Sequence, residues 1–216
     1  MRQVVVLGCT GSIGTNSLQA ISRSSDLRVT GLSVAKSYRR LFALAKKHKV
    51  KYGQVDSPEA YKQARRHKPA RFKLYGPQEL DDFIAAVPAD IFLSGISGAA
   101  GLPATVAVLN QGKDLALANK ESLVMAGKLV MSLAKKNKAR LLPVDSEHSS
   151  IFKLLQSVPR RAVKNIWLTA SGGPFWRRDW RTFSSITPAQ ALRHPNWRMG
   201  PRISVDSARC STKPGK

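Results

Sequence analysis

Two hydrophobic patterns alternate along roughly the first 145 residues of the chain. Short runs of consecutive apolar residues predict buried strands, and segments whose apolar residues recur every three or four positions predict amphipathic helices. Strands are expected at residues 3–7, 27–34, 52–56, 72–75, 90–94, 114–118 and 139–144, and helices at 13–22, 38–48, 58–66, 77–86, 102–110 and 120–136. Repeated βα units of this kind predict an α/β fold, a Rossmann-like parallel sheet with helices on both faces.

The alternation weakens after about residue 145, where Pro, Trp and Arg accumulate. We therefore predict a domain boundary there. Residues 1–145 form the Rossmann-like domain, and residues 146–216 are expected to form an incomplete α+β domain. Rossmann-like parallel sheets bind ligands at the carboxyl ends of their strands.

Composition and charge limit the possible classes of protein. Hydrophobic residues make up 43% of the chain, which is too many for a disordered protein. No apolar run approaches the ~20 residues of a membrane span, the amino terminus enters a strand pattern without a signal peptide, and the two cysteines suit a reducing cytoplasm. The formal net charge is +23, and thirteen of the basic residues lie within residues 36–73. This excess is compatible with nucleic-acid binding, but no nucleic-acid motif accompanies it, so we expect a solvated basic face and no nucleic-acid partner.

The segment "VVVLGCTGSIGTNSL" combines a strand, a glycine-rich turn and a helix. Glycines at 8, 11 and 14 would let a pyrophosphate approach the backbone, and the helix offers free N–H groups to phosphates. Thr10 and Ser12 add hydroxyl donors. The pattern predicts dinucleotide binding, and a merely structural turn is the alternative.

The end of the second predicted strand discriminates between the two nicotinamide cofactors. NAD-binding proteins usually place an acid there, whereas this chain has Lys36, Ser37, Arg39 and Arg40. These cationic and hydroxyl groups favour NADPH through its 2′-phosphate, unless they only begin a basic helix face.

Two carboxylates, Asp145 and Glu147, follow the last predicted strand, with Ser146 between them. In extended chain they would point the same way, and close oxygen ligands suit Mg²⁺ or Mn²⁺. Capping of a following helix is the alternative.

Four segments carry a family resemblance: "GCTGSIG", "SGISGAAGLPATVAVLNQGKDLALANKESLVMAG" (94–127), "LLPVDSEHSSIF" (141–152), and "SGGPF" (171–175) with "TPAQALRHPNWRMGPRISVDSA" (187–208). Together they resemble the 1-deoxy-D-xylulose 5-phosphate reductoisomerases, in the order and spacing of that family. The resemblance extends from Met1 to about Ala208. It implies that residues 146–216 are part of a catalytic domain that binds metal and substrate.

The resemblance assigns roles residue by residue. It implies NADPH contacts for Thr10, Gly11, Ser12, Ile13, Asn119, Glu121 and Gly200, and sugar-phosphate contacts for Lys120, Ser146, Glu147, Ser171, His194 and Ser207. Asp145 and Glu147 would be the metal ligands, and Trp197 would belong to a lid over the substrate. The family usually has Gly, a basic or polar residue and Asn after the second strand, where this chain has Ala35, Lys36 and Ser37.

The resemblance also implies a reaction. 1-Deoxy-D-xylulose 5-phosphate would be converted to 2-C-methyl-D-erythritol 4-phosphate in non-mevalonate isoprenoid biosynthesis. The divalent ion polarises the ketone, the skeleton rearranges by cleavage and re-addition, and the aldehyde is reduced with NADPH. Members of the family are generally homodimers, and this chain is expected to be cytoplasmic.

The last residues, "RCSTKPGK", depart from the family, which continues approximately Thr-Met-Met-Asn-Lys-Gly-Leu-Glu. That Glu is the third protein ligand of the metal. Codons for the observed tail, read one base earlier, can encode the lost motif, so we hypothesise a single-base deletion near codon 208, which resequencing would test. As it stands, the chain is expected to bind NADPH and to turn over little or no substrate, or to be an inactive NADPH-binding remnant.

Overall fold

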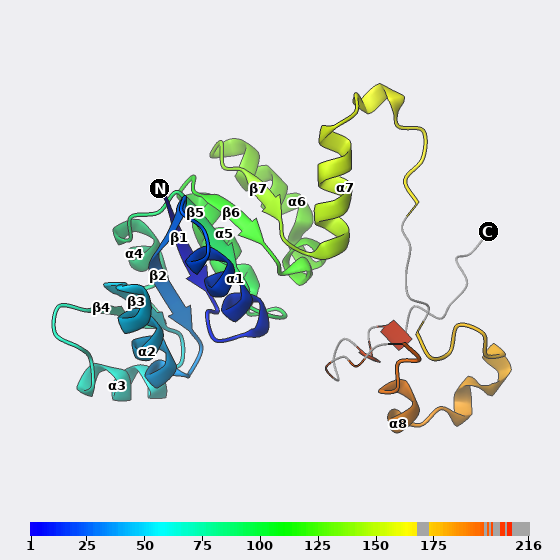
Figure 1. Cartoon of the computed structure of the whole chain (residues 1–216), viewed down its shortest axis with the longest axis horizontal. Helices are drawn as coiled ribbons and strands as arrows, with labels where there is room; N and C mark the ends of the chain where they lie inside the picture. Colours follow the sequence, from blue (N-terminus) through cyan, green and yellow to red (C-terminus); the bar gives the residue numbers. More distant parts are fainter. Residues whose placement is uncertain (168–172, 197, 199, 201–203, 206, 209–216) are drawn as a thin grey trace. The chain divides into compact units, whose positions relative to one another are not determined.

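Seven strands form one parallel sheet in the computed structural model of the chain (Figure 1). The structure describes residues 1–167, 173–196, 198, 200, 204–205 and 207–208. The strands are β1 (Arg2–Leu7), β2 (Leu27–Val34), β3 (Tyr52–Val55), β4 (Lys73–Tyr75), β5 (Ile91–Ser94), β6 (Asp114–Leu117) and β7 (Leu141–Pro143). Their spatial order is β4-β3-β2-β1-β5-β6-β7, and every neighbouring pair is parallel. Strands β2 to β4 are added on one side of β1, and β5 to β7 are added on its other side. The boundary between β1 and β5 is therefore the topological switch point, where such sheets bind ligands.

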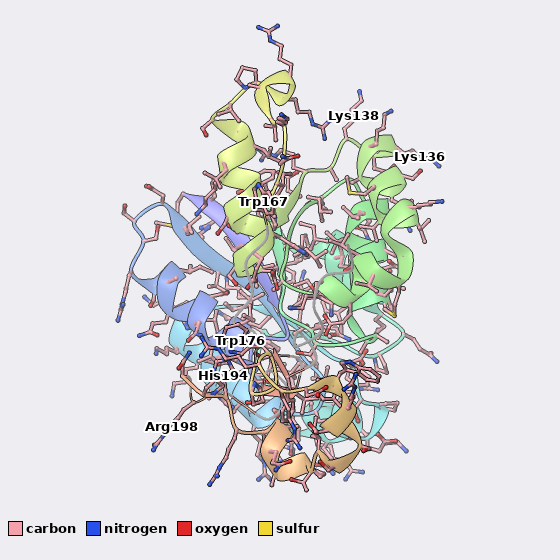
Figure 2. The ribbon with its side chains drawn as sticks, turned by 90° about the vertical axis from the view of Figure 1, so that its right-hand side faces the viewer. Lys136, Lys138, Trp167, Trp176, His194 and Arg198 are labelled. Atoms are coloured by element: carbon pink, nitrogen blue, oxygen red, sulfur yellow. The ribbon has the colours of Figure 1, made fainter. Side chains whose placement is uncertain are left out.

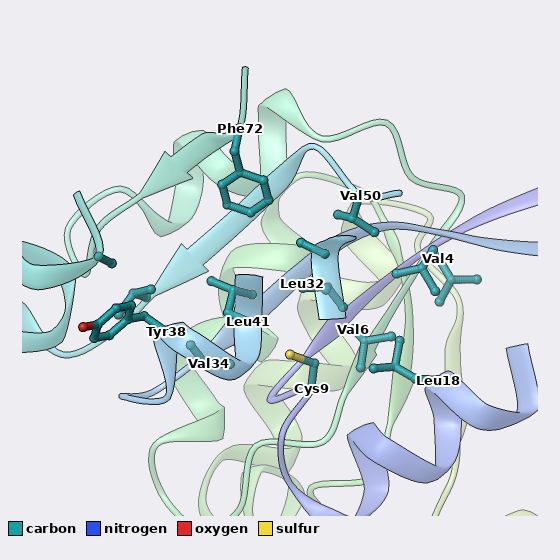
Figure 3. Packing of buried hydrophobic residues seen from close by; sticks show 14 of the residues in the cluster. Val4, Val6, Cys9, Leu18, Leu32, Val34, Tyr38, Leu41, Val50 and Phe72 are labelled. Carbon is teal, nitrogen blue, oxygen red and sulfur yellow. The ribbon is translucent and has the colours of Figure 1, made fainter. Parts of the chain in front are cut away.

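Helices cover both faces of the sheet, because alternate residues of each strand point to opposite sides. The helices are α1 (Ser12–Ser22), α2 (Tyr38–His48), α3 (Pro58–Arg66), α4 (Leu80–Ala86), α5 (Gly101–Asn110), α6 (Lys120–Lys136) and α7 (Ser146–Gln156). Val4 and Val6 of β1 pack in one hydrophobic cluster with α1, α2 and α3 (Figure 3). Val5 and Leu7 belong to a second cluster with α4, α5 and α6. The predicted α/β fold class is confirmed.

The predicted helix at 77–86 is wrong at its start, since α4 begins only at Leu80. The preceding residues form a turn that Glu79 closes. Its carboxylate accepts hydrogen bonds from the Gly76 N–H at 2.6 Å and from the Tyr61 hydroxyl at 3.0 Å. The carboxylate thus ties β4 to α3 and competes with helix formation over the first three predicted positions.

The chain divides into two units, Met1–Val158 and Pro159–Lys216. The described part of the second unit contains short helical segments, namely two 3-10 helices, Arg160–Ala162 and Trp180–Ser185, and α8 (Pro188–Ala191). The Arg178 guanidinium holds this unit locally, donating to the Thr182 hydroxyl at 2.8 Å and the Ser185 hydroxyl at 2.9 Å. The functional domain boundary predicted at residue 145 remains a prediction. The two structural units divide after Val158, so α7 lies in the first unit. None of the helices in the described ranges has both the length and the apolar character needed to cross a membrane.

Candidate active site

A cleft of about 450 Å³ lies at the carboxyl ends of β1, β2, β3 and β5. The glycine-rich loop contributes Thr10 and Gly11 to its wall, and the loop after β5 contributes Ser97. Ser33 at the end of β2 ties the sheet to the glycine loop, because its hydroxyl accepts a hydrogen bond from the Gly8 N–H at 3.2 Å. The cleft thus occupies the switch point of the sheet, beside the loop that the sequence predicts to bind phosphate.

The glycine loop has a conformation that side chains would prevent. Gly8 has a φ of +75°, in the left-handed region that favours glycine. A Cβ atom on Gly14 would lie 2.6 Å from the Cα atom of Cys9, so α1 can approach the end of β1 only without one. No side chain caps α1 at Gly11, and its first N–H groups remain available to an anion.

The structure brings most of the predicted cofactor residues to this edge of the sheet. Thr10 and Gly11 line the cleft, while Ser12 and Ile13 are exposed in the first turn of α1. Lys36 and Ser37 are exposed directly after β2. This arrangement suits a dinucleotide whose phosphates lie on the loop and whose 2′-phosphate lies near β2.

Asn119 is nearly fully buried and uses its side-chain amide within the protein. The amide nitrogen donates to the carbonyl oxygens of Ile96 at 2.7 Å and Gly98 at 2.9 Å. The amide oxygen accepts from the N–H of Ser122 at 2.8 Å and also from the Ser122 hydroxyl. An amide has two donor hydrogens and one acceptor oxygen, so this side chain is satisfied. Asn119 therefore fixes the loop after β5 to the start of α6, and its predicted contact with NADPH remains a prediction.

Lys120 and Asp145 meet across the ends of two neighbouring strands. β6 pairs with β7 so that Leu117 lies opposite Pro143, and both side chains follow closely after these positions. The Lys120 Nζ atom lies 3.3 Å from the Asp145 carboxylate, whose side chain is 15% exposed. Burial raises the pKa of Asp145, but the hydrogen bond and charge of Lys120 outweigh it, so the pKa lies below its usual value. The ammonium group of Lys120 therefore favours the ionised form of Asp145.

The extended geometry predicted for Asp145 and Glu147 is wrong, because Asp145 is the N-cap of α7 and Glu147 lies in its first turn. These are the positions that the capping alternative describes, although the Asp145 side chain makes no capping hydrogen bond. The Ser146 hydroxyl donates to the Glu147 carboxylate at 2.6 Å. Both carboxylates therefore lie at the start of a helix and not on a strand. Within the described ranges, no group of three His, Cys, Asp or Glu residues is arranged to hold a metal.

The remaining predicted residues are Glu121 of the first unit and several residues beyond Val158. Glu121 is half-buried in the first turn of α6. His194 is half-buried, labelled in Figure 2, and its Nδ1 atom accepts a hydrogen bond from the Asn196 N–H at 3.2 Å. Gly200 is exposed and Ser207 half-buried. The predicted residues Ser171 and Trp197 lie outside the described residues.

Gln54 and Asp56 also line the cleft, and sequence reasoning did not select them. Gln54 is 3% exposed at the end of β3, and its amide donates to the Gly76 carbonyl at 3.5 Å. The signal was a polar residue inside the otherwise apolar strand pattern "YGQVD". The strand order explains its position, because β3 ends two strands away from the glycine loop.

Two sequence models of one family match the chain. The model described as 1-deoxy-D-xylulose 5-phosphate reductoisomerase matches residues 4–127. The model described as its C-terminal domain matches residues 141–214. The chain belongs to the 1-deoxy-D-xylulose 5-phosphate reductoisomerase family. These matches cover the glycine loop, Asn119, Lys120 and the Asp145–Glu147 segment in the order predicted.

Curated reductoisomerases from several bacteria are similar to this chain. The enzyme of Oleidesulfovibrio alaskensis is 45% identical over 216 residues, which cover 98% of this chain and 53% of the relative. That of Clostridium novyi is 39% identical, over 96% of this chain and 55% of the relative. The chain therefore spans about half the length of the curated relatives it matches.

Solved reductoisomerase structures have the same fold. A reductoisomerase from Zymomonas mobilis in complex with NADPH has a TM-score of 0.83 at 37% identity, covering 96% of this chain and 54% of its own. A reductoisomerase in complex with NADPH, fosmidomycin and magnesium has a TM-score of 0.81 at 34% identity, with the same coverage.

Proposed function

We propose that this chain supplies the cofactor-binding domain and part of the metal and substrate site of an NADPH- and divalent-metal-dependent reductoisomerase. The reaction is the conversion of 1-deoxy-D-xylulose 5-phosphate to 2-C-methyl-D-erythritol 4-phosphate, a step of isoprenoid biosynthesis. The Lys120–Asp145 ion pair carries the proposal, because it lies at the same edge of the sheet as the glycine-rich cleft. Residues 1–145 are the NADPH-binding domain, and residues 146–216 belong to the catalytic domain.

The cleft fits the pyrophosphate of a dinucleotide cofactor. The left-handed Gly8 and the close packing of Gly14 leave the backbone of the loop open to a pyrophosphate. Exposed Lys36, followed by Ser37, supplies a cation and a hydroxyl where an NAD-specific protein would have an acid. Similar solved reductoisomerases bind NADPH, which supports the same cofactor here.

The carboxylates Asp145 and Glu147 fit Mg²⁺ or Mn²⁺. These ions prefer oxygen ligands, and Mg²⁺ is often held by one or two carboxylates together with water and substrate oxygens. A bound divalent ion would polarise the substrate ketone. A related reductoisomerase is in complex with magnesium, which supports this choice.

Side chains of the protein would orient the substrate. Lys120 lies beside Asp145 and would hold a substrate oxygen next to the metal ligands. Ser146, at the first position of α7, adds a hydroxyl to the same place. His194, Ser171 and Ser207 are proposed to bind the sugar phosphate, and Glu121 and Gly200 the cofactor. We further propose a homodimer, as in the family, and a cytoplasmic location, which suits the free and buried Cys9. We propose no nucleic-acid partner, because no nucleic-acid motif accompanies the basic residues.

Binding of Mn²⁺ and NADPH tests the site separately from turnover. Replacing Asp145 by Asn removes a ligand charge, so Asp145→Asn should weaken Mn²⁺ binding by roughly tenfold or more. It should leave NADPH affinity unchanged, because the glycine loop is not altered. Mn²⁺ is measured by electron paramagnetic resonance, and NADPH by its fluorescence. Asp26→Asn, at an exposed carboxylate, is the matched control and should change neither affinity.

Two results would contradict the proposal. One is equal Mn²⁺ affinity in the parent and Asp145→Asn proteins, and the other is the failure of NADPH to bind the parent protein. Little NADPH oxidation is expected of this chain by itself, because it is proposed to supply only part of the metal and substrate site, and any oxidation should require both 1-deoxy-D-xylulose 5-phosphate and Mg²⁺. Oxidation that needs neither would point to a different oxidoreductase.

A further inference from the structure

A second concave site lies at the amino-terminal ends of β3 and β4, at the opposite ends of these strands from the cofactor cleft. It is a groove of about 590 Å³ lined by residues of 42–51 and 69–72, which we name the α2–β4 groove. One wall is the last part of α2 with the turn into β3, and the other is the loop that leads into β4. Nothing proposed for NADPH, metal or substrate uses this groove.

The floor of the α2–β4 groove is apolar and well packed. Phe42 and Phe72 contact each other edge to face, with ring centres 5.5 Å apart and an interplanar angle of 85°. Phe72 and Val50 are buried and belong to the hydrophobic cluster shown in Figure 3. The floor is therefore part of the core and does not depend on a ligand to keep its shape.

Four cations surround this apolar floor. Lys46, Lys49, Lys51 and Arg71 line the groove, and all four are exposed. Within the described ranges the ion pairs found are Lys120–Asp145 and Arg140–Asp114, so no carboxylate described in the structure neutralises these four. No acidic residue lines the groove. The site thus combines an apolar surface with unneutralised positive charge.

Two of these cations occupy backbone positions that would favour glycine. Lys49 has a φ of 56° and Arg71 a φ of 63°, both in the left-handed region. Lys49 directly follows α2 as its C-cap, and glycine is the usual left-handed residue after a helix. Backbone stability alone therefore favours glycine at both positions, whereas a cationic rim requires the side chains that are present. Lys138, with a φ of 55° and labelled in Figure 2, is a third basic residue in this conformation, and it does not line the groove.

We propose that the α2–β4 groove binds a small amphiphilic anion, with an apolar body on Phe42 and Phe72 and a phosphate or carboxylate head among the four cations. The volume lies within the roughly 300–1,000 Å³ range of small-molecule sites. Four cations without an acid select an anionic head over a neutral or cationic one. The proposal is independent of the reductoisomerase reaction.

Monododecyl phosphate, below its micellar concentration, is the probe, and titration calorimetry measures its binding to the full chain. One molecule should bind per chain. The double variant Lys49→Gly/Arg71→Gly should weaken binding by at least about tenfold, because two charged contacts are lost. Its melting temperature should stay the same or rise, since glycine fits both left-handed positions. Loss of binding therefore cannot be attributed to unfolding.

Lys138→Gly is the matched control, because it removes one positive charge at a left-handed position elsewhere. It should leave affinity for monododecyl phosphate unchanged. Equal binding by the parent and double-variant proteins would overturn the proposal, as would equal binding of dodecyltrimethylammonium, which has the opposite head charge. Tighter, groove-dependent binding of a DNA oligonucleotide or an acidic peptide would overturn it in favour of a macromolecular partner.

Discussion

Asp114 and Arg140 form the more elaborate of the two described ion pairs. Arg140 donates to the Asp114 carboxylate through its Nε atom at 2.8 Å, its Nη2 atom at 2.5 Å and its backbone N–H at 2.8 Å. Burial raises the pKa of Asp114, but the hydrogen bonds and charge of Arg140 outweigh it, so the pKa lies below its usual value. The folded state therefore stabilises the ionised carboxylate. This stabilisation is complete above the unfolded pKa of about 4 and is lost as pH falls through the lower folded pKa.

We predict that Asp114→Asn lowers the free energy of unfolding by about 1 kcal/mol at neutral pH. The value is modest because the Arg140 side chain is 65% exposed and its charge is screened by water. The difference between parent and variant should shrink as pH falls below about 4. Urea unfolding at a series of pH values measures it, and a difference that stays constant through the acid range would contradict the prediction.

At the scale of residues, the sequence indicates which side-chain chemistry a site contains better than it indicates which residues contact each other. Asp145 and Glu147 could be predicted as neighbouring carboxylates, but the sequence left open whether they lie on extended chain or at the start of a helix, and the structure places them at the start of α7. The Lys120–Asp145 pair joins residues 25 apart in the sequence, and only the pairing of β6 with β7 brings them together. Asn119 shows the same limit, because its satisfied amide depends on carbonyl groups of the loop after β5.

At the scale of elements, most helices and strands could be predicted because local signals agree with burial. α3 begins as expected at Pro58, and the Ser57 side chain accepts from the Ala60 N–H. The turn that precedes α4 was not predicted, because it is held by the Glu79 carboxylate, which accepts hydrogen bonds from Gly76 and from Tyr61 of α3. The last strand is shorter than the predicted 139–144, since the Ala139 N–H still bonds to the Ala134 carbonyl at the end of α6.

Asn119 connects two elements through one side chain, and the substitution Asn119→Asp separates its two functions. The aspartate would retain the oxygen that accepts from the Ser122 N–H at the start of α6. It would lose both donors to the Ile96 and Gly98 carbonyls. We predict that NADPH affinity falls about fivefold, because the loop that lines the cleft is released at a cost of about 1 kcal/mol.

The matched control for this prediction is Asn137→Asp, at the other end of α6. Its amide likewise donates to a backbone carbonyl, that of Leu109 at 2.9 Å, but away from the cleft. Both variants should lose stability in thermal unfolding, whereas only Asn119→Asp should weaken NADPH binding in fluorescence titrations. Equal effects of the two on NADPH affinity would mean that Asn119 acts on stability alone.

At the scale of the whole molecule, charge is the property that the fold does not explain. The parallel sheet follows from the alternation of strands and helices, which the hydrophobic pattern predicted. The net charge of +23 does not contribute to that pattern. All thirteen basic residues of 36–73 are exposed, as expected for a solvated face. This face begins at Lys36, where the 2′-phosphate of NADPH is proposed to bind.

A positive field of this size should steer an anionic cofactor toward the cleft. We predict that the association rate constant of NADPH falls about tenfold between low and high salt, because salt screens charges beyond ~10 Å. The dissociation rate constant should change much less, since the contacts in the cleft remain. Stopped-flow fluorescence measures both.

The double variant Arg65→Glu/Arg66→Glu separates steering from contact. Both side chains are exposed in the last turn of α3, and neither lines the cleft. Reversing them should slow association by about two- to threefold at low salt and have no effect at high salt, where the field is screened. If the variant instead changes the dissociation rate constant, these arginines contact the cofactor. If neither rate constant responds to salt or to charge reversal, the basic face has no part in capturing NADPH.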